Sequence, residues 1–128
     1  MQSTSIFLLD PNAWRGVFVA KIIAIVNQKG GVGKTTTCVN LTAALHEAGQ
    51  RVLLCDFDPQ ANATSGMGVD KSVSQGVYQA LIGEAEPRDA VVTTRYGDVL
   101  PSNKALAGAG IELIGMESRE ILLKRVLD

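Results

Sequence analysis

A glycine-rich stretch between an apolar run and a helical pattern constrains the fold of this chain more than any other feature. The apolar run covers residues 22–26, glycines occupy positions 30, 31 and 33, and the helical pattern runs from Thr37 to Gly49. Glycines permit positive φ and let the backbone approach a ligand closely. A strand, a glycine loop and a helix in this order form the arrangement that binds the phosphates of a nucleotide. The sequence therefore predicts an α/β fold with a phosphate-binding loop.

The residues around the glycines supply the groups that phosphate binding needs. Successive backbone amides can form an anion-binding concavity, and the following helix adds the positive end of its dipole. Lys34 is placed to reach the β- and γ-phosphates, Thr35 to ligate Mg²⁺, and Thr36 to hydrogen-bond the α-phosphate. The alternative is a glycine-rich turn that binds nothing. The candidate ATP-binding residues are Lys29, Gly30, Gly31, Val32, Gly33, Lys34, Thr35 and Thr36.

The spacing departs from the ordinary P-loop motif at one position. In the pattern G-x-x-x-x-G-K-S/T, counted back from Gly33, the first glycine would stand where this chain has Gln28. The chain instead fits K-G-G-x-G-K-S/T, the deviant Walker A motif, whose additional lysine is Lys29. The alternative for Lys29 is a solvated lysine in a loop.

Two segments of the chain resemble the ParA/Soj family of partition ATPases. The first runs from Asn27 to Leu41 and contains the loop, and the second runs from Asp56 to Gly66 and begins Asp-Phe-Asp-Pro-Gln. Shorter matches follow at Leu100-Pro101-Ser102-Asn103 and at Ser118-Arg119-Glu120. The resemblance extends from about residue 21 to residue 128 and implies a P-loop NTPase-like parallel sheet flanked by helices.

The resemblance also implies roles for two aspartates and two lysines. Asp58 would be the catalytic carboxylate that orients or activates the attacking water, and Lys34 and Lys29 would be further catalytic residues. Asp56 would support the Mg²⁺ shell through water, together with Thr35 as a metal ligand. Lys29 would reach the nucleotide of a partner subunit, so that dimerisation depends on ATP. The alternative is that Asp56 caps the end of the strand and Asp58 begins an Asp-Pro turn.

The family implies a dimeric switch, driven by ATP and Mg²⁺, for chromosome or plasmid partitioning. Such a switch acts with a ParB-like partner in the cytoplasm, associates with the nucleoid, and binds DNA without sequence preference through a C-terminal half that this chain lacks. No membrane partner is expected. One alternative is a membrane positioning ATPase resembling MinD, which a C-terminal amphipathic helix would identify. The other is a truncated nucleotide-binding module without turnover.

The chain is expected to stop before a second acidic motif. P-loop ATPases carry an apolar strand that ends in aspartate for the Mg²⁺ shell, and nothing after Asp58 fits the family's Asp-x-Pro-Pro version. In the family this strand pairs beside the loop strand. We therefore expect residues 22–26 to expose apolar surface and unpaired backbone groups. Marginal stability and little or no ATP hydrolysis would follow, so whether the isolated chain is an enzyme stays open.

Residues 1–20 precede the resemblance, and residues 21–128 are expected to form the N-terminal part of a ParA-type ATPase domain. Asp10 and Pro11 interrupt the apolar residues of the leader, which makes it a poor signal peptide and too short to span a membrane. We expect a mobile leader, or alternatively a short helix that packs through Trp14, Val17 and Phe18. The net charge of −1 gives no general indication of nucleic-acid binding.

The remaining pattern predicts the other elements. Apolar runs at residues 22–26 and 52–55 indicate strands covered on both faces, with the helix between them ending near Gly49. Ser74 is expected to cap a helix that ends before Gly83. Short strands are expected at 91–94 and 99–100, and a final helix at 117–127. We expect Cys38 and Cys55 to be buried thiols and His46 to be a surface or packing residue of its helix.

Overall fold

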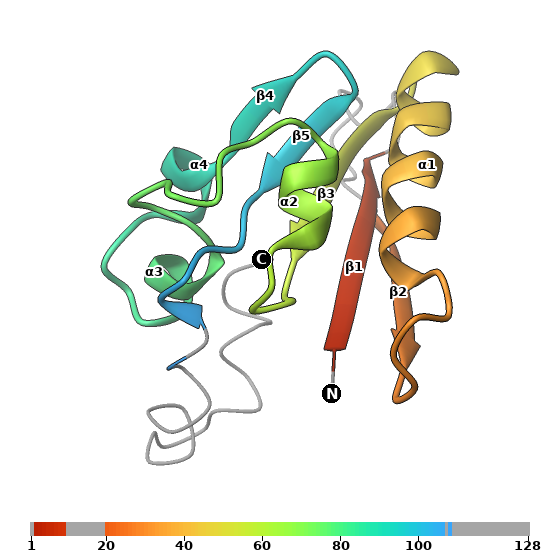
Figure 1. The fold of residues 1–128 in the computed structure, drawn as a ribbon. Helices are drawn as coiled ribbons and strands as arrows, with labels where there is room; N and C mark the ends of the chain where they lie inside the picture. The colour runs from red at the N-terminus through yellow and green to blue at the C-terminus, as the bar shows by residue number, and fades with distance from the viewer. Residues whose placement is uncertain (1, 10–19, 107, 109–128) are drawn as a thin grey trace.

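The fold is a five-stranded mixed sheet with helices on both faces (Figure 1). The computed structural model describes residues 2–9, 20–106 and 108, and for residues 2–9 and 20 it describes the backbone alone. The sheet order is β2-β1-β3-β5-β4, and β2, β3 and β5 share one direction, to which β1 and β4 are antiparallel. The predicted α/β class is confirmed. The strands are β1 (Gln2–Leu9), β2 (Ala20–Asn27), β3 (Arg51–Asp56), β4 (Val92–Thr94) and β5 (Gly97–Leu100).

Within the described residues, four helices connect the strands. They are α1 (Lys34–Glu47), α2 (Asn62–Gly66), α3 (Val77–Leu81) and α4 (Pro87–Ala90). The predicted helix after the glycine loop is α1, which begins three residues earlier than the apolar pattern indicated. Gly49 ends it as expected, because with φ of 81° it lets the amide of Gln50 donate to the carbonyl of Leu45 over 3.0 Å. No helix in the described part of the chain is long and apolar enough to cross a membrane.

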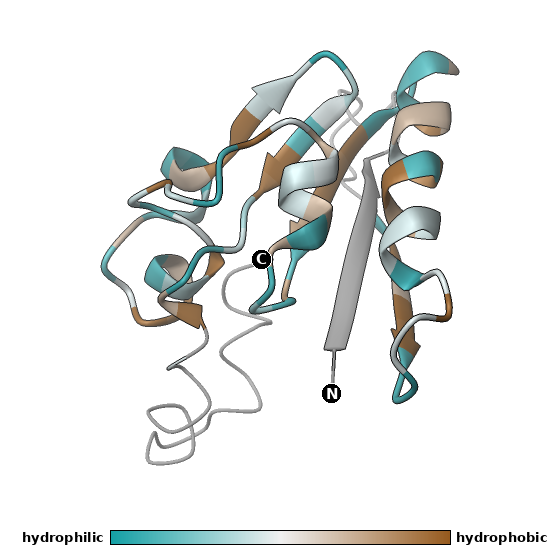
Figure 2. Cartoon of the chain, viewed as in Figure 1, coloured by the Kyte–Doolittle hydropathy of each residue, from teal (hydrophilic) through white to brown (hydrophobic). Residues whose placement is uncertain are grey.

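The alternating side chains of β3 divide the core into two clusters. Val52 and Leu54 pack with α1 and α2 on one face of the sheet, whereas Leu53 and Cys55 pack with α3 and α4 on the other. Figure 2 shows the hydrophobic colour along β2, β3 and β5 and its alternation with hydrophilic colour along α1. Cys38 and Cys55 are buried thiols outside any disulfide, as expected, and burial raises the pKa of Cys55 so that its thiol stays protonated.

The loop strand β2 is the least covered of the strands whose side chains the structure describes. Ile23 and Ile25 pack against the α1 face of the core, but Ile22 is 60% exposed and Val26 is 51% exposed on the opposite face. The expected exposure of apolar side chains is therefore present. The expectation of unpaired backbone groups is wrong along one edge of β2, where β1 is hydrogen-bonded to it.

Residues 2–9 form a β-strand, where we expected a mobile leader or a short helix. In β1, Ile6 lies opposite Ile23 of β2 and opposite Leu54 of β3, and both pairings are antiparallel. The physical reason is that β1 fills the space of one strand between β2 and β3. The backbone N–H and C=O groups that these two strands direct into that space require hydrogen-bond partners. The apolar run at residues 6–9 is too short to distinguish the period of a strand from that of a helix. Its pairing therefore could not be predicted from the local sequence. Trp14, Val17, Phe18 and the helix expected at 117–127 lie outside the described residues.

The cap of α3 also differs from the expectation. Gly76, and not Ser74, precedes the helix, and its amide donates to the side-chain oxygen of Gln79 over 3.0 Å. A Cβ at Gly76 would lie 2.5 Å from the carbonyl oxygen of Pro101, so tertiary packing requires glycine there. The helices α2 and α4 were not predicted because five and four residues are too few to show an apolar period.

The position of β1 can be tested by replacing Ile6 with proline. In a strand paired on both sides, proline removes a ladder hydrogen bond, so we expect the free energy of unfolding to fall by about 3 kcal/mol. Urea unfolding followed by circular dichroism measures the change, and Ile6→Val, which keeps the backbone donor, is the control. A proline variant as stable as the Ile6→Val variant would contradict a central β1.

Candidate functional site

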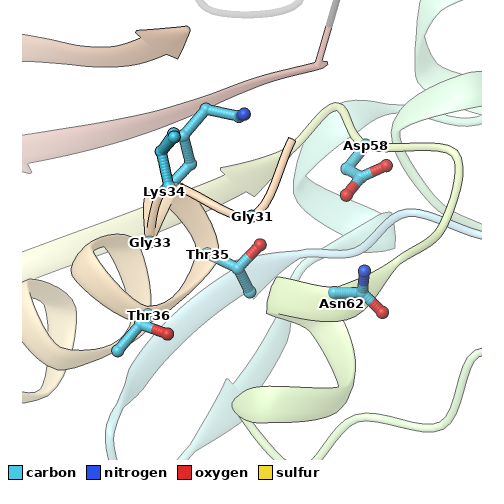
Figure 3. A pocket seen from close by; sticks show the side chains of 8 residues that line it. Gly31, Gly33, Lys34, Thr35, Thr36, Asp58 and Asn62 are labelled. Carbon is cyan, nitrogen blue, oxygen red and sulfur yellow. The ribbon is translucent and has the colours of Figure 1, made fainter. Parts of the chain in front are cut away.

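A pocket of about 370 Å³ lies between the loop after β2 and the segment after β3. Its position beyond the carboxyl ends of two strands of the same direction is the usual location of ligand sites in open α/β sheets. Figure 3 shows Asp58 and Asn62 on one side of this pocket, with Gly31 and Thr35 facing them. The lining residues are Gly31, Val32, Gly33, Lys34, Thr35, Thr36, Asp58 and Asn62.

The loop backbone has the conformation that its glycines predict. Gly31 has φ of 69° and Gly33 has φ of 84°, which side chains with a Cβ rarely adopt. A Cβ added at either glycine would meet no atom within 4 Å, so the space beside both is open. Gly33 is the N-cap of α1 and has no side chain that could accept a hydrogen bond from the first backbone amides of the helix. The first turn of this described helix also contains no acidic residue. The start of α1 is therefore available to an anion.

The two lysines of the motif lie in different places. The Nζ atom of Lys34 donates to the carbonyl oxygen of Lys29 over 2.7 Å, and the amide of Lys29 donates to Oδ1 of Asn27 over 3.0 Å. These two bonds close the loop on itself. Lys29 and Gly30 are exposed and, unlike the other predicted ATP-binding residues, do not line the pocket. The role of Lys29 toward a partner subunit stays a prediction.

Asp58 lines the pocket and also begins the turn that the sequence offered as an alternative, while its catalytic role stays a prediction. It lines the pocket and is only 4% exposed. Its Oδ1 also accepts the amide of Gln60 over 2.9 Å, and its carbonyl accepts the amide of Ala61 over 2.8 Å, which makes it the first residue of a turn. The turn therefore holds the carboxylate at the pocket. Among the described contacts, Oδ2 of Asp58 has no hydrogen-bond partner that would compete with a ligand.

Asp56 lies behind the pocket and does not line it. Its Oδ1 accepts the amide of Asp58 over 3.0 Å, and its Oδ2 accepts both the amide and the hydroxyl of Thr64, over 2.8 and 2.7 Å. Complete burial raises the pKa of Asp56, and the hydrogen bonds from Thr64 and Asp58 offset this only in part. These contacts support a structural role, and the magnesium role implied by the family resemblance stays a prediction.

The sequence reasoning assigned no role to Asn62, which lines the pocket beside Asp58. It follows Ala61, a buried residue whose positive φ of 53° is unusual for a side chain with a Cβ. The Nζ atom of Lys71 supports this turn through the carbonyl of Gln60, over 2.9 Å. Strain of this kind is often held at functional segments. The signal available in the sequence was the place of Asn62 in the Asp56–Gly66 segment, shortly after the Asp-Pro pair.

The chemistry of the lining residues fits a nucleoside triphosphate with Mg²⁺. Open space beside two glycines, free amides at the start of α1 and the Lys34 ammonium all favour phosphate oxygens. Within the described residues no group of three His, Cys, Asp or Glu side chains could hold a metal by itself. Mg²⁺ fits this set nevertheless, since it is commonly held by one or two protein oxygens together with phosphates and water. Thr35 supplies such an oxygen from the lining.

The mixed α/β sheet and the glycine loop define a P-loop nucleotide-binding protein. Residues 20–128 match a protein family described as an AAA domain. The chain belongs to this family and, within it, to the ParA/Soj partition ATPases, of which it is an N-terminal portion.

Two relatives show how far the similarity extends. The chain is 55% identical over 113 residues to the sporulation initiation inhibitor protein Soj of Bacillus subtilis, which covers 86% of this chain and 45% of Soj. It is 44% identical over 112 residues to the chromosome partitioning protein ParA of Myxococcus xanthus, covering 85% of this chain and 40% of ParA. The chain thus spans less than half the length of these relatives.

A solved structure gives the same result for the fold. The cobyrinic acid a,c-diamide synthase of Mycobacterium smegmatis, with a bound ATP analogue and magnesium, superposes with a TM-score of 0.76 at 46% identity. The match covers 80% of this chain and 43% of the synthase. That protein therefore binds an ATP analogue and magnesium on the same fold.

Proposed function

We propose that this chain is the ATP- and Mg²⁺-binding portion of a partition ATPase. The observation that carries the proposal is that residues 31–36 of the loop and Asp58 after β3 line the same pocket. A phosphate-binding loop alone explains nucleotide binding. A buried carboxylate in the same pocket adds the group that a hydrolase needs beside the terminal phosphate.

The proposed roles follow from the chemistry of each side chain. The loop amides and Lys34 bind the phosphates, and Thr36 donates to the α-phosphate. Thr35 would hold Mg²⁺, which would supply positive charge to neutralise the phosphates. Asp58 orients a water molecule whose oxygen attacks the γ-phosphorus while the bond to the β–γ bridging oxygen breaks. The products are ADP and phosphate.

The finer parts of the proposal rest on the family. We propose that ATP binding drives dimerisation through Lys29, and that the complete protein binds DNA and works with a ParB-like partner at the nucleoid. These steps are supported by the similarity to Soj and ParA. We further propose residues 21–128 as the N-terminal part of the ATPase domain, to whose sheet residues 2–9 of the preceding segment contribute β1.

A second candidate is a nucleotide-binding module without turnover. The observation that favours it is that the similarity reaches only 45% of Soj and 40% of ParA. A membrane positioning ATPase is the weaker alternative, because the Asp-Phe-Asp-Pro-Gln segment resembles the partition type.

The proposal is tested by measuring ATP binding and phosphate release with the Asp58→Asn variant. We expect the variant to bind ATP with a Kd within about threefold of the wild type, because the loop is unchanged. Phosphate release should fall by about 100-fold or more, as expected when a group that acts on the attacking water is neutralised. Calorimetry gives the Kd, and a phosphate-release assay gives the rate.

The assay is run on the 128-residue chain and on a chimera completed with the second half of Bacillus subtilis Soj. The exposed Asp70→Asn change is the matched control. Binding by both proteins with release by the chimera alone would favour the module without turnover for the shorter chain. Release by Asp58→Asn at the wild-type rate in the chimera would contradict the role of Asp58.

A further inference from the structure

We propose that Ser102, directly after β5, is a positioning residue that holds Asp58 in the orientation required at the pocket. The inference deepens the proposed function, since it names a residue that controls the proposed catalytic carboxylate without touching the nucleotide. Ser102 belongs to the Leu100-Pro101-Ser102-Asn103 segment, which the nucleotide site does not use.

The contacts of Ser102 are made by both its side chain and its backbone. Its Oγ donates to the carbonyl oxygen of Asp58 over 2.7 Å, and its amide donates to Oγ1 of Thr64 over 2.9 Å. Thr64 in turn donates to Oδ2 of Asp56 over 2.7 Å. Ser102, Thr64 and Asp56 are all fully buried. A buried hydrogen bond between groups far apart in sequence, here residues 58 and 102, constrains the segment that it reaches.

The two peptide groups of Asp58 are held by different partners. Asp56 accepts the Asp58 amide over 3.0 Å, and Ser102 donates to the Asp58 carbonyl over 2.7 Å. Because the peptide planes before and after the residue are both restrained, the direction of its side chain is restrained as well. The Ser102 hydroxyl is therefore the contact through which the end of β5 sets the Asp58 carboxylate.

Ser102 is itself held in place from the opposite side. Its neighbour Pro101 accepts the amide of Val77 at the start of α3 over 2.8 Å. Asn103 donates to the side-chain oxygen of Gln79 over 2.9 Å and to the carbonyl of Val73 over 3.2 Å. The segment that carries Ser102 is thus anchored to α3, and a rigid anchor is what a positioning contact needs.

The competing explanation is that Ser102 is a buried serine that satisfies its own hydrogen bonds and stabilises the fold. The two explanations differ in what its removal does. A structural role predicts an equal loss of protection in all parts of the core, whereas a positioning role predicts a loss confined to the Asp58 turn and restored by any hydroxyl at position 102.

The experiment is amide hydrogen exchange on the full 128-residue chain carrying Ser102→Ala. We expect the amides of Gln60 and Ala61, which bond to Asp58, to exchange at least tenfold faster, and those of β3 to change less than twofold. Ser102→Thr should restore the wild-type rates. Ser102→Cys, with a weaker donor in nearly the same volume, should be intermediate and covers the case in which the threonine methyl does not fit. Ser65→Ala, a change of an exposed serine, is the matched control.

ATP binding in the presence of Mg²⁺ is measured on the same proteins. The Kd of Ser102→Ala should lie within threefold of the wild type. Any of three results would overturn the positioning role. They are equally faster exchange throughout the core, unchanged exchange rates at the Gln60 and Ala61 amides, and a weakening of ATP binding as large as that of Lys34→Ala. If the wild type itself binds no ATP, the proposed function fails, while the exchange rates and their restoration by threonine still decide whether Ser102 holds Asp58.

Discussion

Replacing Lys34 with alanine is expected to weaken the binding of ATP by about 10- to 150-fold. The ammonium group lies at the pocket beside the glycine loop, and a hydrogen bond between a charged donor and a phosphate contributes about 1.5–3 kcal/mol. In the free protein the Nζ atom bonds only to the carbonyl of Lys29 among the described contacts, and both residues are at least partly exposed. The loss of this bond should therefore change stability little.

Calorimetric titration with ATP and Mg²⁺ measures the effect of Lys34→Ala. Lys104→Ala removes the same charge from an exposed position and is the control for a change in net charge. Both variants should melt within a few degrees of the wild type. Unchanged ATP binding by Lys34→Ala would mean that the glycine loop does not hold the phosphates, and the interpretation of the whole site would fail with it.

Replacing Asp56 with alanine is expected to lower the free energy of unfolding by about 3–5 kcal/mol, the largest stability effect that this structure predicts. The carboxylate accepts the amide of Asp58 and both the amide and hydroxyl of Thr64. Alanine would leave these buried donors without an acceptor, at about 1–3 kcal/mol for each unsatisfied group before relaxation. A cost of this size would unfold a chain of marginal stability.

The pH dependence of this contribution has a definite sign. Burial raises the pKa of Asp56 above its ordinary value of 3.8 in the folded state. The folded state therefore retains a proton that the unfolded chain has already released. The stabilisation that comes from the titration of Asp56 is therefore fully present below pH 3.8. It is lost as the pH rises through the pKa that Asp56 has in the folded state. Asp56→Asn removes the titration and keeps one oxygen acceptor.

Urea unfolding of the wild type and Asp56→Asn at several pH values tests both statements. The stability of the wild type relative to the variant should decrease as the pH rises above 3.8, and subtraction cancels the other carboxylates that both proteins share. Asp70→Ala, at a fully exposed aspartate, should cost far less than Asp56→Ala. An Asp56→Ala variant as stable as Asp70→Ala would contradict the hydrogen-bond network around Thr64.

Local patterns in the sequence were sufficient for the loop and its flanks. Positive φ at Gly31 and Gly33, the end of α1 at Gly49 and the strand β3 all follow from residue types at fixed spacing. Such features depend on the intrinsic preferences of a few consecutive residues, which do not need the rest of the fold. The Asp58 turn, which the sequence offered as the alternative to a catalytic role, has the same origin, since an aspartate before proline bonds to its own following backbone.

The sequence by itself determined the nucleotide loop, the α/β class and the family, because each rests on short-range periodicity or on a contiguous motif. Only the tertiary structure decided that residues 2–9 pair between β2 and β3, that Asp56 faces Thr64 and not the pocket, and that Ser102 reaches Asp58. These contacts join residues far apart in the chain. Their partners are selected by burial and by the need to satisfy buried polar groups, which no local pattern records.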